Sequence, residues 1–361
     1  MTIQQQDLMM ALGFHVRGRW IGPGAEPFII AEMSGNHNGS KERALEIVRI
    51  AAGCGVDCLK FQTYRADTIT LNSRRNDFVI CDEKSLWKGR QLYELYDEAH
   101  TPWEWHEDLF AAAAEFGVLA FSTPFDETAV DFLDRLGVPM FKIASFEMTH
   151  LPLIAKAART GKPIVMSTGM ATAEEIEEAV VTARDAGARD IVLLKCTSQY
   201  PANAGDANLL TIPDMAKRFG VQVGLSDHTL GVGVAVAAVV HGATVIEKHF
   251  TLDRNDGGVD STFSLEPWEM RLLKEETVRA WRSRGEVRYG GTENEANSRR
   301  FRQSIYPSRD IVAGEIFSRE NLKICRPGLS LEPRYFEGLL GKPARRTIAF
   351  GERLTIDDVQ D

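Results

Sequence analysis

The sequence feature that most limits the fold is a series of eight short apolar runs, most of which are followed by a helical stretch. Each run is nearly continuous in apolar residues and ends in polar ones, which is typical of parallel strands covered on both sides. The runs are residues 28–32, 58–62, 119–123, 140–145, 163–168, 191–197, 221–227 and 244–250.

The stretches between the runs carry helix signals. Residues 41–55 space their apolar side chains as a helix does, residues 102–117 begin with proline, and residues 172–187 place acids in the first turn. All three end at glycine, a common helix stop. From the third run onward, successive strands begin about 20 to 30 residues apart. Eight such units predict a (β/α)8 TIM barrel, with a doubly wound open sheet as the alternative.

Changes in composition divide the chain of 361 residues. We expect an N-terminal extension over residues 1–20 and the barrel over 21–285. Residues 286–298 are polar and contain glycine, which suits a linker. Residues 299–361 form short β-like pieces between turn residues and predict a small, mostly β domain. A domain of this size is near the lower limit for independent stability, so we expect its stability to depend on contact with a partner.

The overall composition narrows the class of protein. Apolar content of 44% and charged content of 26% are ordinary for a globular enzyme, and no apolar run is long enough to span a membrane. A formal charge of −9 argues against general binding to nucleic acid. The five cysteines are odd in number and irregularly spaced, and the first residues do not resemble a secretion signal. We therefore expect a cytoplasmic protein with reduced thiols.

Polar residues end all eight predicted strands. In barrel enzymes the reaction takes place at the carboxyl ends of the strands. A single buried polar group there is more often a satisfied core residue, but eight polar strand ends together predict an active site. The residues at or just after these ends are Glu32, Lys60, Gln62, Ser122, Thr123, Lys142, Ser145, Glu147, Ser167, Thr168, Thr197, Tyr200, Ser226, His228, Glu247 and His249.

Two histidines follow neighbouring strands of the predicted barrel. Glu247 and His249 are two residues apart and share a side of their strand, whereas Lys248 points the other way, toward the helices. His228 follows the strand before, so two imidazoles can approach one point. This arrangement suits a divalent transition metal, with a metal-free histidine acting as acid and base as the alternative. No HExxH motif specifies a metal.

Lysines and hydroxyl groups also gather at the strand ends. Lys60 and Lys142 supply positive charge, and residues 122–126 and 167–171 each lead toward a helix start. Cations, hydroxyl groups and helix N-termini together favour an anion, either phosphate or carboxylate. The sequence has neither a P-loop nor a GxGxxG turn, so use of a nucleotide is not supported.

A long connection of residues 64–101 follows the second predicted strand. Loops after barrel strands lie on the catalytic face, and the aromatic and charged residues of this one suit a lid or a substrate wall. An ordinary surface insertion is the alternative.

The motifs at the strand ends resemble those of the sialic acid synthase family, which condenses phosphoenolpyruvate with an amino sugar. They are IIAEMSGNHNGS, LKFQTYRADT, FSTPFD, FKIASFE, MSTGMAT, LLKCTSQYP, GLSDHT and IEKHFTLD, in order along the chain. IYPSRDIVAGE and CRPG resemble the family's small C-terminal antifreeze-like (SAF) domain. EMSGNHN and residues 85–106 are most similar to the branch that uses 2,4-diacetamido-2,4,6-trideoxy-L-altrose, with branches acting on other acetamido sugars as the alternative.

The resemblance implies roles for individual residues. His228 and His249 would hold the metal, usually manganese, with magnesium and cobalt also open. The carboxylates of Glu32, Glu147 and Glu247 would act in catalysis, together with His249. The residues that would hold phosphoenolpyruvate are Lys60, Thr123, Lys142, Ser145, Ser167 and Ser226. Those on the sugar side would be Gln62, Tyr200, Asp260 and Arg326.

The resemblance also implies an assembly. In a domain-swapped homodimer, Arg326 of the small domain would reach the sugar site of the other copy. Many family members have asparagine where Ser198 and Gln199 stand here, so sugar contacts at this point are expected to differ. Neither nucleic acid nor a membrane is an expected partner. The rival interpretations are a metal-dependent aldolase, a phosphoenolpyruvate-using synthase for another sugar, and a carbohydrate-binding or ice-binding protein.

Overall fold

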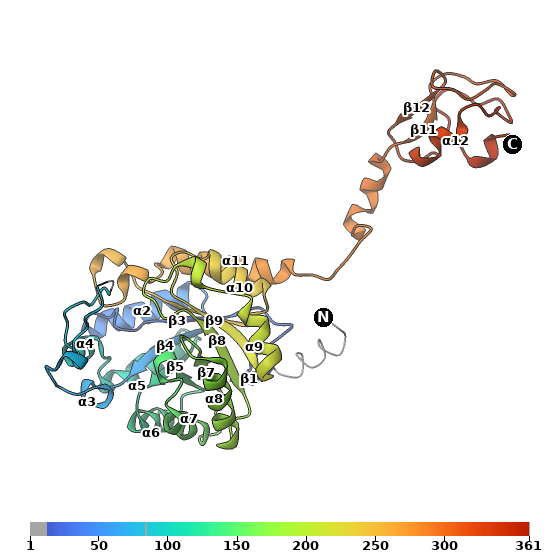
Figure 1. Cartoon of the computed structure of the whole chain (residues 1–361). Coiled ribbons are helices and arrows are strands. Elements are labelled where there is room, and N and C mark those ends of the chain that lie inside the picture. The colour runs from blue at the N-terminus through green and yellow to red at the C-terminus, as the bar shows by residue number, and fades with distance from the viewer. Residues whose placement is uncertain (1–12, 84, 361) are drawn as a thin grey trace. The chain divides into compact units, whose positions relative to one another are not determined.

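A computed structural model describes residues 13–83 and 85–360 of the chain (Figure 1). It divides into two compact units, one up to Gly285 and one from Glu286 on. The first unit contains the barrel, and the second contains the small C-terminal domain. None of the helices in the described ranges has the length and hydrophobicity of a membrane-spanning segment.

The first unit is a closed barrel of eight parallel strands, as the sequence predicts. Strand β10 pairs with β9 on one side and with β3 on the other, which closes the sheet and rules out the doubly wound alternative. The strands are β3 (Phe28–Glu32), β4 (Cys58–Thr63), β5 (Leu119–Pro124), β6 (Phe141–Ile143), β7 (Ile164–Ser167), β8 (Ile191–Cys196), β9 (Gln222–Asp227) and β10 (Val245–His249).

Helices surround the barrel (Figure 1). They are α2 (Lys41–Gly53), α5 (His106–Glu115), α6 (Glu127–Arg135), α7 (Leu151–Ala158), α8 (Ala173–Asp185), α9 (Thr211–Phe219), α10 (Gly233–Val240) and α11 (Pro267–Ser283). Side chains of Ser40, Asp126 and Thr172 accept hydrogen bonds from the first turns of α2, α6 and α8, which fixes where these helices begin.

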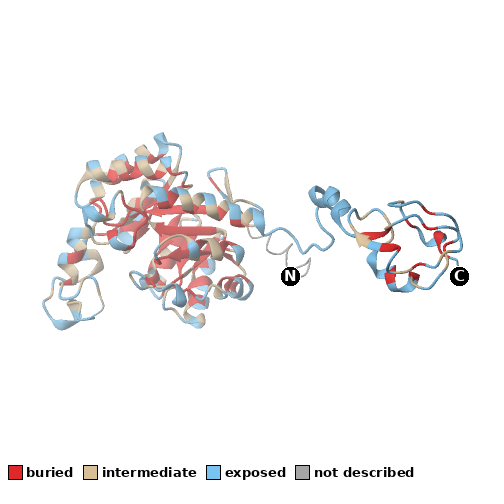
Figure 2. Cartoon of the chain, turned by 90° about the horizontal axis from the view of Figure 1, so that it is seen from above, coloured by how far each residue is buried: buried red, intermediate tan, exposed pale blue. Residues whose placement is uncertain are grey.

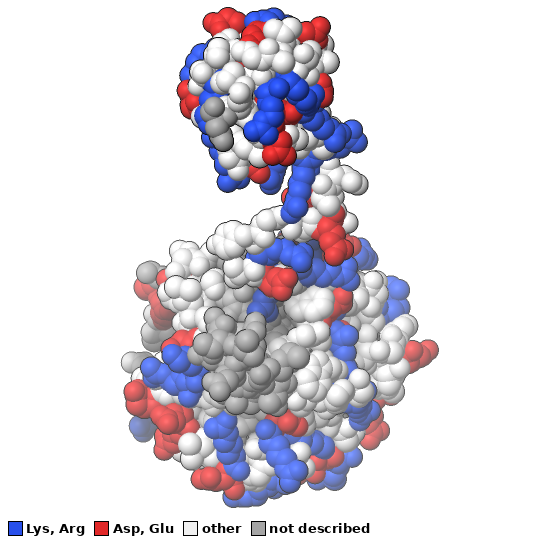
Figure 3. Space-filling view, turned by 90° about the vertical axis from the view of Figure 1, so that its right-hand side faces the viewer, with Lys and Arg blue, Asp and Glu red and all other residues white. Residues whose placement is uncertain are grey.

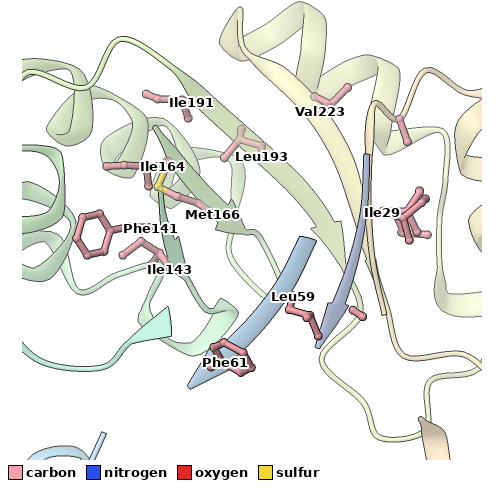
Figure 4. Close-up of a cluster of buried hydrophobic side chains, with 14 of the residues drawn as sticks. Ile29, Leu59, Phe61, Phe141, Ile143, Ile164, Met166, Ile191, Leu193 and Val223 are labelled. Atoms are coloured by element: carbon pink, nitrogen blue, oxygen red, sulfur yellow. The ribbon is translucent and has the colours of Figure 1, made fainter. Parts of the chain in front are cut away.

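Alternate residues of each strand point to opposite sides, and this alternation builds two cores. One set, which includes Ile29, Leu59 and Phe61, belongs to a large cluster packed with helix residues (Figure 4). The other set, which includes Ile30 and Cys58, belongs to a second cluster in the barrel interior. Figure 2 shows the strands as the most continuously buried part of this unit. Glu32 and Lys60 follow the interior set by two residues, so the same alternation turns them inward.

A short hairpin contributes to the interior cluster. Strands β1 (Phe14–Val16) and β2 (Arg19–Ile21) pair antiparallel, and Phe14, Val16 and Ile21 are buried among barrel residues. This hairpin overlaps the end of the extension expected over residues 1–20. The rest of that prediction, residues 1–12, lies outside the described residues.

Loops and short helical turns follow the carboxyl ends of the strands. The long connection after β4 contains α3 (Ala66–Ile69), η1 (Asn76–Phe78), α4 (Leu92–Ala99) and η2 (Trp103–Trp105). The shorter turns after later strands are η3 (Ser145–Glu147), η4 (Ala204–Asp206), η5 (Arg254–Asp256) and η6 (Ser261–Phe263).

The second unit has its own small core. Strands β11 (Ser304–Pro307) and β12 (Leu322–Cys325) pair antiparallel, and single bridges such as Ile311 with Ile348 add further β contacts. Ile305, Ile311 and Phe317 are fully buried within this unit. The remaining elements are η7 (Glu293–Phe301), η8 (Pro333–Tyr335), α12 (Phe336–Leu339) and η9 (Ile356–Asp358). Turn η7 begins inside the stretch predicted as a linker.

One face of the barrel unit carries charged side chains of both signs. On the face that Figure 3 shows, Lys and Arg side chains are interspersed with Asp and Glu side chains. The chain as a whole carries a formal net charge of −9.

Candidate active site at the carboxyl ends of the strands

A cavity of about 710 Å³ opens at the carboxyl ends of the barrel strands. This is the place where barrel enzymes carry their chemistry, and the volume suits a small-molecule substrate. Most of the predicted site residues line it, namely Lys60, Gln62, Lys142, Ser145, Glu147, Ser167, Tyr200, Ser226, His228, Glu247, His249 and Asp260.

Six predicted residues lie elsewhere, and three of them, Ser122, Thr168 and Thr197, are strand-end residues to which no specific role was given. Glu32 and Thr123 are buried and do not line the cavity, although the Glu32 carboxylate contacts Lys60, which does. The Oγ1 atom of Thr123 has no hydrogen-bond partner among the residues that the structure describes. Arg326 belongs to the second unit, where it is exposed.

Buried ion pairs form the floor of the cavity, which we define as Glu32, Lys60, Lys142, Ser226 and Glu247. The Lys60 ammonium lies 2.8 Å from Oε2 of Glu32 and 3.2 Å from Oε1 of Glu247. The Lys142 ammonium is 3.9 Å from the same Glu247 oxygen. The Ser226 hydroxyl donates to this oxygen at 2.9 Å. Adjacent strands bring the groups together, since Lys60 pairs with Glu32 and Ser226 with Glu247 in the sheet register.

The pKa directions show which floor groups carry charge. Burial raises the pKa of Glu247, but Lys142 and Lys60 outweigh burial and hold it at about 2. Burial lowers the pKa of Lys60, but Glu247 and Glu32 raise it above its ordinary value overall. Burial raises the pKa of Glu32 despite Lys60. Lys60 and Glu247 therefore hold each other in their charged forms, whereas burial opposes the charge on Glu32.

Of the two lysines in the floor, Lys142 has the charge that nearby carboxylates balance less well. Its ammonium donates to Oγ of Ser167 at 2.7 Å and to the carbonyl of Ile143 at 3.0 Å. Burial lowers the pKa of Lys142 to about 8. A buried cation is costly unless it is paired, so the floor gains from a substrate anion beside Lys142.

The two predicted histidines meet at one side of the cavity. The ring centroids of His228 and His249 are 5.3 Å apart. Nδ1 of His228 lies 2.9 Å from the carbonyl of Thr197, and because a carbonyl only accepts, this nitrogen carries a proton. Nε2 of a neutral His228 therefore keeps its lone pair. Nδ1 of His249 is buried and lacks a hydrogen-bond partner within the described part of the chain.

These imidazoles fit part of a metal site. Burial lowers the pKa of His249 well below its ordinary value, and the neutral ring that results is the form that ligates metal. Burial also lowers the pKa of His228, but its hydrogen bond and charge interaction with Cys196 raise it overall. No group of three or more His, Cys, Asp or Glu side chains in residues 13–83 and 85–360 is arranged to hold a metal. The protein offers two nitrogen ligands, so water or substrate would complete the coordination.

The long connection after β4 forms a largely apolar wall of the cavity. We call this wall, made of Ile69, Ile80, Leu86, Trp87, Leu92 and Leu95, the insertion wall, and all six residues line the cavity. Trp87 anchors it, because its Nε1 donates to the carbonyl of Val259 at 3.1 Å and its ring lies 5.9 Å from that of Tyr200. The structure thus supports the substrate wall over the ordinary insertion.

Other lining residues were missing from the sequence prediction. Ser34, Tyr64, Tyr96 and Cys196 all line the cavity. Cys196 ends β8 and is buried, so the strand pattern that singled out its neighbours could also have found it. Tyr96 lies on α4 within the insertion, where no motif marks it.

Lys248 confirms the predicted alternation at the end of β10. Its ammonium is fully buried and donates to Oδ2 of Asp227 at 2.8 Å. It also donates to the carbonyls of Thr229 at 2.6 Å and Gly231 at 2.8 Å. Lys248 thus secures the loop that follows β9 and carries His228, and it does not line the cavity.

Glu147 stands apart from the ion pairs of the floor. It lines the cavity, and burial raises its pKa to about 7 even though Lys142 opposes the shift. Its Oε2 atom has no hydrogen-bond partner in the described residues. The site thus combines a floor of buried lysines and carboxylates, a histidine pair and a carboxyl group whose pKa near neutrality allows it to give or take a proton.

Comparisons with known proteins match both parts of the chain. Residues 47–289 match the NeuB family, and residues 302–360 match the SAF domain. The pseudaminic acid synthase of Campylobacter jejuni subsp. jejuni serotype O:2 is 43% identical over 92% of this chain and 96% of its own. That of Helicobacter pylori is 39% identical over 92% of this chain and 98% of its own.

A solved structure is also similar. The N-acetylneuraminic acid synthetase from Leptospira borgpetersenii serovar Hardjo-bovis, crystallised with citrate, matches with a TM-score of 0.71 at 31% identity. The match covers 79% of this chain and 94% of the crystallised one. Sequence and fold comparisons therefore point to the same group of proteins.

Proposed function

Because this chain belongs to the NeuB family, we propose that it is a pseudaminic acid synthase. In this proposal it condenses phosphoenolpyruvate with 2,4-diacetamido-2,4,6-trideoxy-L-altrose, giving pseudaminic acid and phosphate. The observation that carries the proposal is the similarity to pseudaminic acid synthases over nearly the whole length of both proteins. A synthase for N-acetylneuraminic or legionaminic acid is the alternative.

The reaction needs one new carbon–carbon bond. C3 of phosphoenolpyruvate attacks the aldehyde carbon of the open-chain sugar, and the aldehyde oxygen takes up a proton. Water adds at C2 of the phosphoenolpyruvate part, and phosphate leaves with cleavage of the C2–O bond. The donor carries a carboxylate and a phosphate, so its negative charge must be held throughout the reaction.

The floor supports this task. Lys142 and the Ser167 hydroxyl, joined at 2.7 Å, offer a cation and a polar group to the donor anion. Lys60 is already engaged by two carboxylates, so it keeps the floor rigid and contributes less free charge than Lys142. Preorganised donors of this kind stabilise charge as it develops, because they need no reorientation during the reaction.

For the aldehyde we propose a divalent cation held by His228 and His249, with manganese first and magnesium or cobalt as alternatives. Bound there, such an ion would act as a Lewis acid on the sugar carbonyl. The support from the structure is a pair of imidazoles facing the cavity, one with a fixed tautomer and one with an unpartnered nitrogen among the described residues.

Glu147 is the better supported candidate for handling the water and its proton. Glu32 lies off the cavity and is held by Lys60, whereas Glu147 lines the cavity with a pKa of about 7. We therefore assign to Glu147 the role of orienting the water that adds at C2.

The apolar insertion wall supports the proposal that the substrate is a 6-deoxy sugar. Its apolar side chains can contact the methyl groups of a 6-deoxy diacetamido sugar. We also propose that the protein is cytoplasmic and works as a domain-swapped homodimer in which Arg326 of the partner subunit completes the sugar site. The support for Arg326 is its exposed position in the matched SAF domain.

A sugar panel tests the proposed function. The protein is incubated with phosphoenolpyruvate, manganese and acetamido sugars of the altro, manno and legionamino types, and products and phosphate are measured. The proposal expects phosphate release and a nine-carbon acid with the altro sugar at the highest kcat/KM. Preference for another acetamido sugar would favour the alternative, and activity with pyruvate in place of phosphoenolpyruvate would indicate an aldolase.

A further inference from the structure

Ser34 adopts a backbone conformation that its residue type disfavours. Its φ angle is +49°, in the left-handed region where glycine is usual and a side chain is strained. Arg17, Asn38 and Asn208 are the other non-glycine residues with positive φ in the described ranges, and none of them lines the cavity. Ser34 does line it and is only 2% exposed. Such strain at a functional site calls for a reason.

The Ser34 hydroxyl is used twice. It donates a hydrogen bond to Oδ2 of Asp260, and it accepts one from Nε2 of Gln62 at 3.1 Å. The Ser34 backbone N–H donates to Oε1 of Glu32 at 3.0 Å. A glycine at this position would relieve the backbone, yet it would lose both contacts of the hydroxyl. The strained residue therefore links the floor to Asp260.

Asp260 lies on the loop after β10, which enters the cavity beside the histidines. Its Oδ2 is 3.9 Å from Nδ1 of His249. The loop is tied down from the Ser34 side, since Nδ2 of Asn36 donates to the carbonyl of Phe250 at 2.9 Å and to Oγ of Ser264 at the same distance. These contacts place the loop backbone, whereas the Ser34 hydroxyl contacts the carboxylate itself.

We propose that Ser34 is a positioning residue for the sugar end of the reaction. Its hydroxyl holds the Asp260 carboxylate beside His249, where the carboxylate can accept a hydrogen bond from a hydroxyl group of the sugar. The inference deepens the proposed function and rests on it. It explains why a serine occupies a backbone position that suits glycine.

Two substitutions separate the hydroxyl from the backbone strain. Ser34→Gly removes both, and Ser34→Ala removes the hydroxyl but keeps the strain. We expect both to raise KM for the sugar and to lower kcat/KM by about tenfold or more, while KM for phosphoenolpyruvate stays unchanged. We expect the Tm of Ser34→Gly to equal or exceed that of the wild type, and the Tm of Ser34→Ala to be lower than that of Ser34→Gly.

A matched control comes from Asn208, which is exposed, has a φ of +45° and does not line the cavity. Asn208→Gly removes comparable backbone strain and should leave all kinetic constants unchanged. A purely structural role for Ser34 predicts the opposite pattern, in which Ser34→Gly keeps full activity or loses stability along with activity.

A double-mutant cycle with Asp260→Asn completes the test. If Ser34 acts through Asp260, the double variant Ser34→Gly/Asp260→Asn should be no slower than Asp260→Asn alone. If the two substitutions lower kcat/KM independently, so that their losses multiply, the proposal is overturned.

A crystal structure of Ser34→Gly gives a readout that does not depend on turnover, because the Asp260 carboxylate should turn away from His249. An unchanged position of this carboxylate would contradict the proposal. Wild-type turnover in the sugar panel tests the proposed function separately.

Discussion

The floor and the insertion wall of the cavity differ in the structural elements and in the residue types that form them. The floor consists of strand ends in a closed barrel, and its lysines and carboxylates are fixed by sheet register and ion pairs. The wall comes from a loop with short helices, and its surface is mostly apolar. In the function that we propose, the floor and its adjoining histidines carry the chemistry, and the wall contributes to the choice of sugar. Substitutions in the two regions should therefore have different effects.

The largest effect should come from the histidine pair beside the floor. His249→Ala is expected to lower kcat by about a thousandfold or more, because it removes a ligand for the proposed Lewis acid. The fold should survive, which far-ultraviolet circular dichroism and Tm can check. Manganese binding, followed by titration calorimetry, should weaken in parallel. Full activity of this variant, or of the wild type after chelation, would exclude the metal from the mechanism.

Within the floor, the two lysines should differ. Lys60→Met leaves the carboxylates of Glu32 and Glu247 without their closest cation, and we expect it to cost about 3 to 5 kcal/mol of stability. Lys142→Met loses a 3.9 Å ion pair and the hydrogen bonds to Ser167 and to the Ile143 carbonyl, but it leaves Lys60 beside both carboxylates. It should therefore destabilise less than Lys60→Met, yet raise KM for phosphoenolpyruvate more. Urea denaturation and steady-state kinetics measure both. Equal losses of stability in the two variants would show that Lys60 is not the main ion-pair partner of the floor carboxylates.

Glu147 should give a pH-dependent effect. Its pKa of about 7 in the folded chain exceeds the ordinary value of 4.5, so ionisation destabilises the folded state increasingly between those pH values. Glu147→Gln should therefore be more stable than the wild type above pH 7, by about 3 kcal/mol, with little difference at pH 4.5. Thermal unfolding across this range tests the sign. A difference that does not vary with pH would refute the assignment.

The wall should give the smallest effect on rate and a clear effect on preference. Leu86 lines the cavity but is 49% exposed, so Leu86→Asn should fold normally. We expect it to reduce the preference for a 6-deoxy sugar over its 6-hydroxy analogue by about tenfold, with KM for phosphoenolpyruvate unchanged. Exposed Leu210, outside the cavity, offers the control Leu210→Asn. If Leu86→Asn and Leu210→Asn prefer the 6-deoxy sugar equally, the wall does not select the sugar.

The same division explains how far the sequence could predict the site. Side chains alternate along a strand with a period of two, so the sequence alone could place Glu247 and His249 on one side of their strand. The ion pair between Lys60 and Glu247 could not be predicted, because the two residues lie on β4 and β10, which flank β3 and do not pair with each other. The strain at Ser34 could not be predicted either, since a sequence shows no φ angles and a left-handed position is expected to hold glycine.

The insertion wall was predicted only as one of two alternatives. Its lining side chains come from separate short elements with no common period, so no pattern marks which of them face the cavity. Arg326 shows another limit. Its proposed role depends on a second copy of the chain, and a motif in one sequence fixes neither the assembly nor the contact.

The most direct test of the condensation follows one oxygen atom. Phosphoenolpyruvate labelled with ¹⁸O in the bridging C2–O position is incubated with the protein, manganese and the altro sugar, and phosphate and product are weighed by mass spectrometry. The proposed mechanism predicts one phosphate carrying the label for each nine-carbon acid formed. Unlabelled phosphate, or acid formed without phosphate, would contradict it.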